Sequence, residues 1–108
     1  MDGDDQIEIS AQELIPLLDQ QPLPFALVDC RERMELGRGI LPGATVMPMS
    51  EMQARIGELD RDRPVVVYCE HGVRSMNVAA YLTGIGMKAR SLSGGFAYWT
   101  GPKVPTEK

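Results

Sequence analysis

One cysteine of this chain lies among residue types that can activate a thiol. Cys69 follows the apolar run Pro64–Tyr68 and opens the segment Cys69–Ser75. Gly72 can adopt backbone conformations that other residues resist, and Ser75 is placed to cap a helix that follows. Successive backbone N–H groups in such a turn converge on an anion. The segment therefore predicts an anion-binding loop with a sulfur at its centre.

The same loop predicts a thiol that is ionised at neutral pH. A free thiol titrates near 8.5, and a helix N-terminus can lower its pKa by about 1.5 units. Arg74, and His71 when protonated, favour the thiolate, whereas Glu70 opposes it. A small core residue is the usual role of a lone cysteine at a strand end. The glycine and arginine at fixed offsets favour instead a nucleophilic thiolate at Cys69.

Short apolar segments alternate with amphipathic ones, and these elements must position the loop. The apolar patterns predict strands at Ile7–Ile9, Phe25–Val28, Ala44–Met47, Pro64–Tyr68 and Lys88–Leu92. A capping box at Ser10–Glu13 predicts a helix that runs through Leu18, and a second at Ser50–Gln53 predicts a helix that runs to about Leu59. Helical spacing predicts two more helices, at Met76–Leu82 and around Phe96–Trp99. The breaker-rich segment Gly37–Gly43 predicts no regular element.

The strand Pro64–Tyr68 indicates how the elements are arranged. It is rich in β-branched residues and shows no alternation, which is typical of a central parallel strand buried on both faces. Strands that alternate with helices predict an α/β fold with a mostly parallel sheet and helices on both faces. Ligands of such sheets bind beyond the carboxyl ends of the strands, where Cys69 lies.

Composition excludes several classes of protein. The 108 residues predict one domain, and eleven Lys and Arg against fifteen Asp and Glu give a net charge of −4, unlike a nucleic-acid binder. No apolar run approaches the ~20 residues of a membrane span, and the N-terminus is acidic rather than signal-like. Two cysteines and one histidine argue against a disulfide scaffold and a zinc site. We expect a monomer from the cytoplasm with a loosely ordered tail at 103–108.

Four segments carry motifs in a fixed order. They are the C-x-x-G-x-R-S loop Cys69–Ser75, a D-x-R-E…E segment over Asp29–Glu35, a G-x-x-P-G-A turn over Gly39–Ala44 and an L-x-G-G-x-x-x-W segment over Leu92–Trp99. Together they resemble the single-domain rhodanese (thiosulfate sulfurtransferase) family from Ile7 to about Pro102. Two positions depart from the family pattern: Ile40 replaces a histidine, and the pair Glu70 and His71 is less basic than usual.

The resemblance implies a three-layer rhodanese-like fold, in which helices flank a five-stranded, mostly parallel sheet. It also implies that the Cys69 thiolate takes a sulfane sulfur from a donor such as thiosulfate. The resulting persulfide, held by loop N–H groups, passes its sulfur to cyanide, a thiol or a sulfur-carrier protein. The loop residues Glu70 to Ser75, including Val73, would bind the substrate, and neither a metal nor an organic cofactor is needed.

Two other functions stay open. A phosphatase or arsenate reductase shares the fold and has Asp-Cys-Arg sequences like Asp29–Arg31, but its loop is C-x5-R. Cys69 and Arg74 here enclose four residues, and one residue fewer removes up to ~3.5 Å of chain and one N–H donor. A rhodanese-like binding or regulatory module without catalysis is the second alternative, although such modules lack the cysteine that this chain has.

Supporting roles follow for residues near the end of the second strand. We expect Glu35 to accept a bidentate contact from Arg74, while Asp29, Arg31 and Glu32 brace neighbouring backbone. Cys30 is expected to be a small buried residue. If its strand neighbours that of Tyr68, however, the two cysteine sulfurs could approach, because adjacent strands lie ~4.8 Å apart. A resolving role, with a Cys30–Cys69 disulfide and release of sulfide, is then conceivable.

Overall fold

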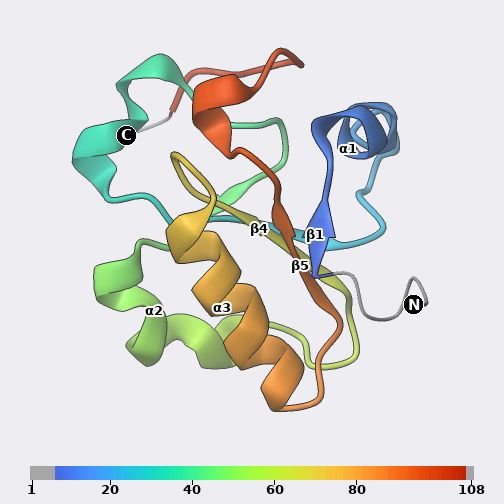
Figure 1. Cartoon of the computed structure of the whole chain (residues 1–108), viewed down its shortest axis with the longest axis vertical. Helices are drawn as coiled ribbons and strands as arrows, with labels where there is room; N and C mark the ends of the chain where they lie inside the picture. The colour runs from blue at the N-terminus through green and yellow to red at the C-terminus, as the bar shows by residue number, and fades with distance from the viewer. Residues whose placement is uncertain (1–6, 107–108) are drawn as a thin grey trace.

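Five strands form one sheet at the centre of the molecule (Figure 1). The computed structural model describes residues 7–106. The strands are β1 (Glu8–Ile9), β2 (Ala26–Asp29), β3 (Thr45–Val46), β4 (Val65–Tyr68) and β5 (Ala89–Leu92). Their order is β1-β5-β4-β2-β3, and every pairing is parallel. All parallel strands therefore end at one edge of the sheet, with β4 in the middle.

Helices cover both faces of this sheet, as the sequence predicts. The α-helices are α1 (Ala11–Leu17), α2 (Met49–Arg55) and α3 (Val73–Gly84), and the 3₁₀ helices are η2 (Arg33–Arg38), η3 (Ile56–Glu58) and η4 (Phe96–Tyr98). One apolar cluster joins the sheet to α1 and η4, and the other joins it to α2 and α3. Figure 1 shows α2 and α3 together on one side and α1 on the other.

The predicted central position of β4 is confirmed. All four of its side chains are buried. Val66 and Tyr68 pack into the cluster with α1, whereas Val65 and Val67 pack into the cluster with α2 and α3. Alternate side chains thus fill both cores, which is why a continuous apolar run is needed here.

One predicted capping box is present and the other is wrong. The Ser10 hydroxyl accepts the Glu13 N–H at 3.0 Å, and the Ser10 N–H donates to the Glu13 carboxylate at 3.1 Å. Helix α2 begins at Met49, so Ser50 lies inside it. The Ser50 hydroxyl and N–H instead donate to the Glu32 carboxylate at 2.7 and 2.9 Å. The Glu32 carboxylate, which comes from another segment, therefore accepts hydrogen bonds at the N-terminus of α2.

The helix after the Cys69 loop also begins earlier than predicted. Gly72 is its N-cap, with φ of 92°, and α3 starts at Val73 rather than Met76. The expectation that Ser75 caps this helix is therefore wrong. Its hydroxyl is engaged instead by the Ser91 hydroxyl at 2.7 Å.

The C-terminal segment contacts the region around η2 as far as the described residues reach. Val104 forms an antiparallel bridge with Ile40, and the Thr106 hydroxyl donates to the Leu36 carbonyl at 3.0 Å. The prediction of a loosely ordered tail stays a prediction, and residues 107 and 108 lie outside the described range. Part of Gly37–Gly43 is regular, because η2 extends to Arg38. No helix in this part of the chain has the length and apolar character to cross a membrane.

Candidate active site

The sulfur of Cys69 is surrounded by hydrogen-bond donors from the loop that follows β4. The Gly72 N–H donates to Sγ at 3.2 Å and the Ser75 N–H at 3.3 Å. The Ser75 hydroxyl oxygen lies 3.4 Å from the same sulfur. Cys69 as a whole is only 1% exposed. The predicted convergence of N–H groups is therefore present, and Sγ lies at its focus.

The turn before η4 supports the outer side of this loop. The Phe96 N–H donates to the Cys69 carbonyl at 2.8 Å, and the Ala97 N–H donates to the Glu70 carbonyl at 2.9 Å. Gly95 makes this contact sterically feasible, because a Cβ there would lie 2.6 Å from both carbonyl oxygens. The carbonyls of Cys69 and Glu70 therefore point toward η4, while the N–H groups of Gly72 and Ser75 point toward Sγ. Gly95 of the Leu92–Trp99 motif thus allows the turn before η4 to pack against the loop.

The environment of Sγ favours the thiolate. The contact with the Cys30 thiol, followed by the Ser75 hydroxyl and the N–H groups of Ser75 and Gly72, lowers the pKa of Cys69 to about 4, against the opposing effect of burial. The expected direction is therefore present, but its main cause differs from the predicted one. Arg74 binds Glu35 and still interacts electrostatically with the charge on Cys69, whereas His71 is exposed.

Arg74 binds Glu35 in the bidentate contact that the sequence predicts. Its two guanidinium nitrogens lie 2.7 and 2.6 Å from the two carboxylate oxygens. This contact lowers the pKa of Glu35 to about 2 and raises that of Arg74. The side chains are 35% and 27% exposed, so the contact is partly open to solvent. It ties the first turn of α3 to η2 beside the loop.

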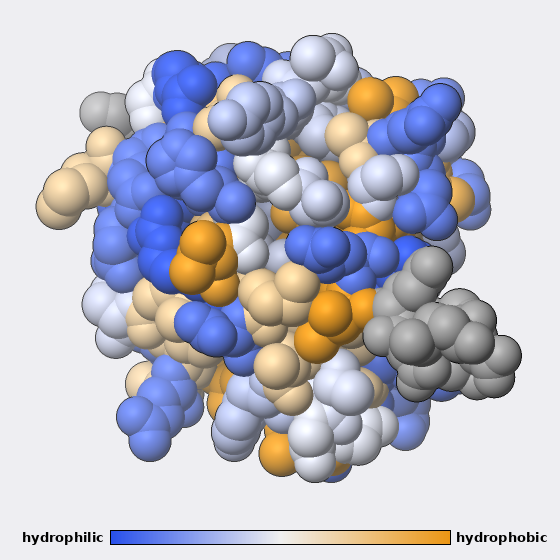
Figure 2. Space-filling model, viewed as in Figure 1, coloured by the Kyte–Doolittle hydropathy of each residue, from blue (hydrophilic) through white to orange (hydrophobic). Residues whose placement is uncertain are grey.

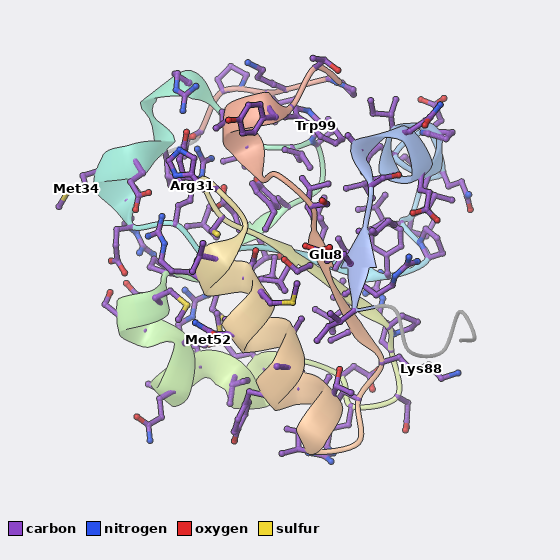
Figure 3. The ribbon with its side chains drawn as sticks, viewed as in Figure 1. Glu8, Arg31, Met34, Met52, Lys88 and Trp99 are labelled. Carbon is purple, nitrogen blue, oxygen red and sulfur yellow. The ribbon has the colours of Figure 1, made fainter. Side chains whose placement is uncertain are left out.

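Arg31 forms a second, fully buried brace. Its guanidinium donates to the Asp29 carboxylate at 2.7 Å, to the Gly39 carbonyl at 2.8 Å and to the Glu35 carbonyl at 3.2 Å. Both side chains of the Asp29–Arg31 pair are 0% exposed. The guanidinium also lies 4.0 Å from the centre of the Phe96 ring. Figure 3 shows Arg31 directed inward between η2 and η4, whereas Met34 projects outward.

Glu70 binds two arginines beside the loop. Its carboxylate contacts Arg31 at 3.4 Å and also binds Arg38, and the side chain is 17% exposed. The expected opposition of Glu70 to the thiolate is therefore offset by two guanidinium groups. Val73, the remaining loop residue, is 70% exposed at the start of α3. Figure 2 shows hydrophilic residues over η2 and the loop, and more hydrophobic ones over α3.

Sequence reasoning missed two contributors to the site, Ser91 and Arg38. Ser91 is buried and binds the Ser75 hydroxyl that faces Sγ. Its signal is a serine in β5 that shares a strand face with the buried Ala89. The contact of Arg38 with Glu70 could not be predicted from the sequence, because the two residues lie 32 positions apart along the chain. The rest of the predicted set gathers within one region at the end of β2 and β4.

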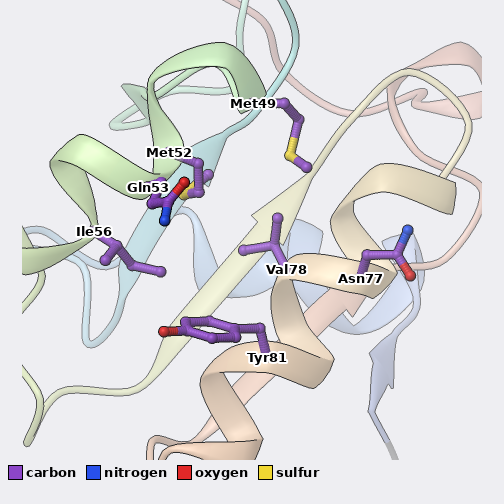
Figure 4. A pocket seen from close by; sticks show the side chains of 7 residues that line it. All are labelled: Met49, Met52, Gln53, Ile56, Asn77, Val78 and Tyr81. Carbon is purple, nitrogen blue, oxygen red and sulfur yellow. The ribbon is translucent and has the colours of Figure 1, made fainter.

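An apolar pocket lies beside the site, between α2 and α3 (Figure 4). Its volume is about 360 Å³, and it is lined by Met49, Met52, Gln53, Ile56, Asn77, Val78 and Tyr81. The loop residues Cys69 to Ser75 do not line it. Within residues 7–106, no group of three or more His, Cys, Asp or Glu side chains could hold a metal ion.

Comparison with known proteins identifies the family. The model of the rhodanese-like domain matches residues 10–102. A sulfurtransferase of Allochromatium vinosum is 38% identical over 80 residues, which cover 73% of this chain and 75% of that protein. The thiosulfate sulfurtransferase GlpE of Shewanella oneidensis is 34% identical over 92 residues, or 84% of this chain and 89% of that protein.

A solved structure agrees with this match. The rhodanese-like domain protein of Staphylococcus aureus superposes with a TM-score of 0.81 at 27% identity, covering 93% of this chain and 98% of that one. The predicted rhodanese-like α/β fold is thereby confirmed. The names of the relatives support a sulfurtransferase in general. The chain belongs to the family of rhodanese-like domains.

Proposed function

We propose that this protein carries a sulfane sulfur as a persulfide on Cys69, between a small anionic donor such as thiosulfate and a thiophilic acceptor. The observation that carries the proposal is the pair of N–H donors at 3.2 and 3.3 Å from a sulfur whose pKa is lowered to about 4. A thiolate is the nucleophilic form of cysteine, and it is populated here at neutral pH.

The first step is attack of the Cys69 thiolate on the outer sulfur of the donor. With thiosulfate, a bond forms between Sγ and that sulfur, the sulfur–sulfur bond of the donor breaks, and sulfite leaves with the electron pair. The negative charge then lies on the outer sulfur of the persulfide. The N–H groups of Gly72 and Ser75, fixed by the turn at Gly95, provide dipoles close to that charge.

The charges around the loop are compatible with an anionic donor. Glu70 would repel a dianion if it faced the sulfur alone, but Arg31 and Arg38 bind its carboxylate. In the second step an acceptor such as cyanide, a thiol or a sulfur-carrier protein attacks the outer sulfur, and the Cys69 thiolate leaves. The low pKa of Cys69 makes it a good leaving group.

The position of Arg74 argues against the phosphatase or arsenate reductase alternative. An enzyme of that kind needs a guanidinium directed at the oxyanion. Here the two terminal nitrogens of Arg74 bind the Glu35 carboxylate, which holds the guanidinium toward η2. Together with the short spacing from Cys69 to Arg74, this contact favours attack on sulfur.

Turnover of thiosulfate and cyanide tests the proposal. Purified protein should form thiocyanate, and the Cys69→Ala variant should fall to the rate without protein. Arg33→Ala is the matched control, because Arg33 is exposed and pairs with Glu51 outside the loop; it should keep the wild-type rate. Equal turnover by wild type and Cys69→Ala would contradict the proposal and favour a binding module. Hydrolysis of a phosphate ester without thiocyanate formation would favour the oxyanion enzyme.

A further inference from the structure

Cys30 is a buried nucleophilic group that the transfer reaction leaves unused. It follows β2, and Cys69 follows β4, the neighbouring strand of the sheet. Asp29 pairs with Tyr68, and the Cys30 N–H donates to the Tyr68 carbonyl at 2.9 Å, so the parallel ladder continues to Cys30. Paired positions of adjacent strands lie about 4.8 Å apart. This spacing falls within the ~4.4–6.8 Å between Cα atoms that a disulfide requires.

Both cysteine side chains also face the same core. Cys30 and Cys69 belong to the apolar cluster with α2 and α3, and they are 0% and 1% exposed. Both are free thiols. The contact with Cys69, followed by burial, raises the pKa of Cys30, so Cys30 keeps its proton and Cys69 carries the charge. The pair is therefore a thiol next to a thiolate in a water-poor setting.

We propose that Cys30 is a resolving residue, which attacks the loaded Cys69 and releases the bound sulfur as hydrosulfide. This inference rests on the proposed persulfide. The Cys30 sulfur forms a bond to Sγ of Cys69, and the bond from Sγ to the outer sulfur breaks. The outer sulfur leaves with the electron pair and takes up the Cys30 proton, so that the products are an internal disulfide and HS⁻. No external oxidant is needed, and a dithiol reductant restores both thiols.

Loading is what makes the two cysteines react. In the empty protein Sγ carries negative charge and repels a second thiolate, and a thiol with a thiolate forms no bond without an oxidant. Once Cys69 is a persulfide, Sγ is a neutral sulfur bonded to a leaving group, and thiol–disulfide exchange can take place there. The negative charge has moved to the outer sulfur, so the contact that raises the pKa of Cys30 weakens.

Two routes then compete for the loaded sulfur. An external acceptor attacks the outer sulfur from the loop side, whereas Cys30 attacks Sγ from the neighbouring strand of the sheet. Release of sulfide is therefore expected when no acceptor is present. The closely held backbone supports this step, because the Cys30 N–H donates to the Tyr68 carbonyl of β4 at 2.9 Å and the Cys30 carbonyl accepts the Met49 N–H of α2 at 3.1 Å.

A single-turnover experiment tests the inference. Reduced protein, freed of reductant, receives one equivalent of thiosulfate, and intact mass and trapped sulfide are followed. Wild type should end about 2 Da lighter than the reduced protein, with about one sulfide per chain. Cys30→Ser should instead stay about 32 Da heavier and release at least tenfold less sulfide. Val28→Ala, a truncation on the same face of β2, is the matched control and should behave as wild type.

The outcomes separate this inference from the proposed function. A wild-type protein that stays about 32 Da heavier without releasing sulfide would overturn the resolving role and leave the persulfide standing. Failure of both wild type and Cys30→Ser to gain sulfur or to form the disulfide would overturn the proposed function itself. The wild-type measurement alone decides the question if Cys30→Ser does not fold.

Discussion

The loop around Cys69 is braced by two arginine–carboxylate contacts that differ in their surroundings. The Arg31–Asp29 pair is fully buried and also binds the carbonyls of Gly39 and Glu35. The Arg74–Glu35 pair is bidentate, with both side chains partly exposed. Loss of a partner leaves an uncompensated charge in the first case, whereas water can solvate it in the second. The buried Arg31–Asp29 pair, the inner contact, should therefore contribute most to the stability of the fold. The partly exposed Arg74–Glu35 pair, the outer contact, should mainly fix the geometry of the loop.

The largest effect is expected for Arg31→Met. The substitution leaves the Asp29 carboxylate buried without a partner and frees the two backbone carbonyls, which should cost about 3–5 kcal/mol in the free energy of unfolding. Urea denaturation measures this loss. Arg33→Met removes an exposed ion pair with Glu51 and should change stability by less than about 0.5 kcal/mol. Similar losses for the two variants would contradict the claim that the buried Arg31–Asp29 contact stabilises the fold more than an exposed ion pair does.

A smaller effect on stability is expected for Glu35→Gln, because solvent screens the contact that it removes. The loss should be about 1 kcal/mol or less. Since Arg74 can then turn and the loop lose its position, persulfide formation should slow by about tenfold. Rapid mixing with thiosulfate followed by mass spectrometry measures that rate. Glu51→Gln, which weakens contacts away from the loop, should leave the rate unchanged.

The contribution of the Arg74–Glu35 contact to stability should depend on pH below about 4.5. The pKa of Glu35 is about 2 in the folded protein and 4.5 as its ordinary value. Its contribution to stability is therefore fully present above pH 4.5 and lost as the pH falls toward 2. Wild type and Glu35→Gln should differ in unfolding free energy at neutral pH and converge toward pH 2. A difference that persists at that pH would contradict the assignment.

The sequence predicts local features of this protein better than distant ones. The strand β4, the loop at Cys69 and the capping box at Ser10 follow from neighbouring residues, and each is present. The capping role of Ser50 is wrong because Glu32, far along the chain, supplies the acceptor. The contact of Val104 with Ile40 likewise joins residues far apart along the chain.

The site shows the same division. The Arg74–Glu35 contact could be predicted because both residues belong to family motifs. The main cause of the low pKa of Cys69 could not, because it is a contact between two strand ends that only the sheet order brings together. The network of Arg38 with Glu70 has no local signal either. These contacts depend on packing between segments that are far apart along the chain, so the loop sequence alone does not predict them.

Titration of the Cys69 thiolate tests the central claim most directly. The ultraviolet absorbance of the thiolate is followed between about pH 3 and pH 8 in wild type and in Cys69→Ser, with folding monitored in parallel. Cys30 stays protonated in this range because its pKa is raised, so the difference between the two proteins reports on Cys69. We predict a midpoint near 4, as the contacts with Cys30, Ser75 and Gly72 require. A thiol that stays protonated up to about pH 7, as a free thiol with a pKa near 8.5 does, would contradict the account.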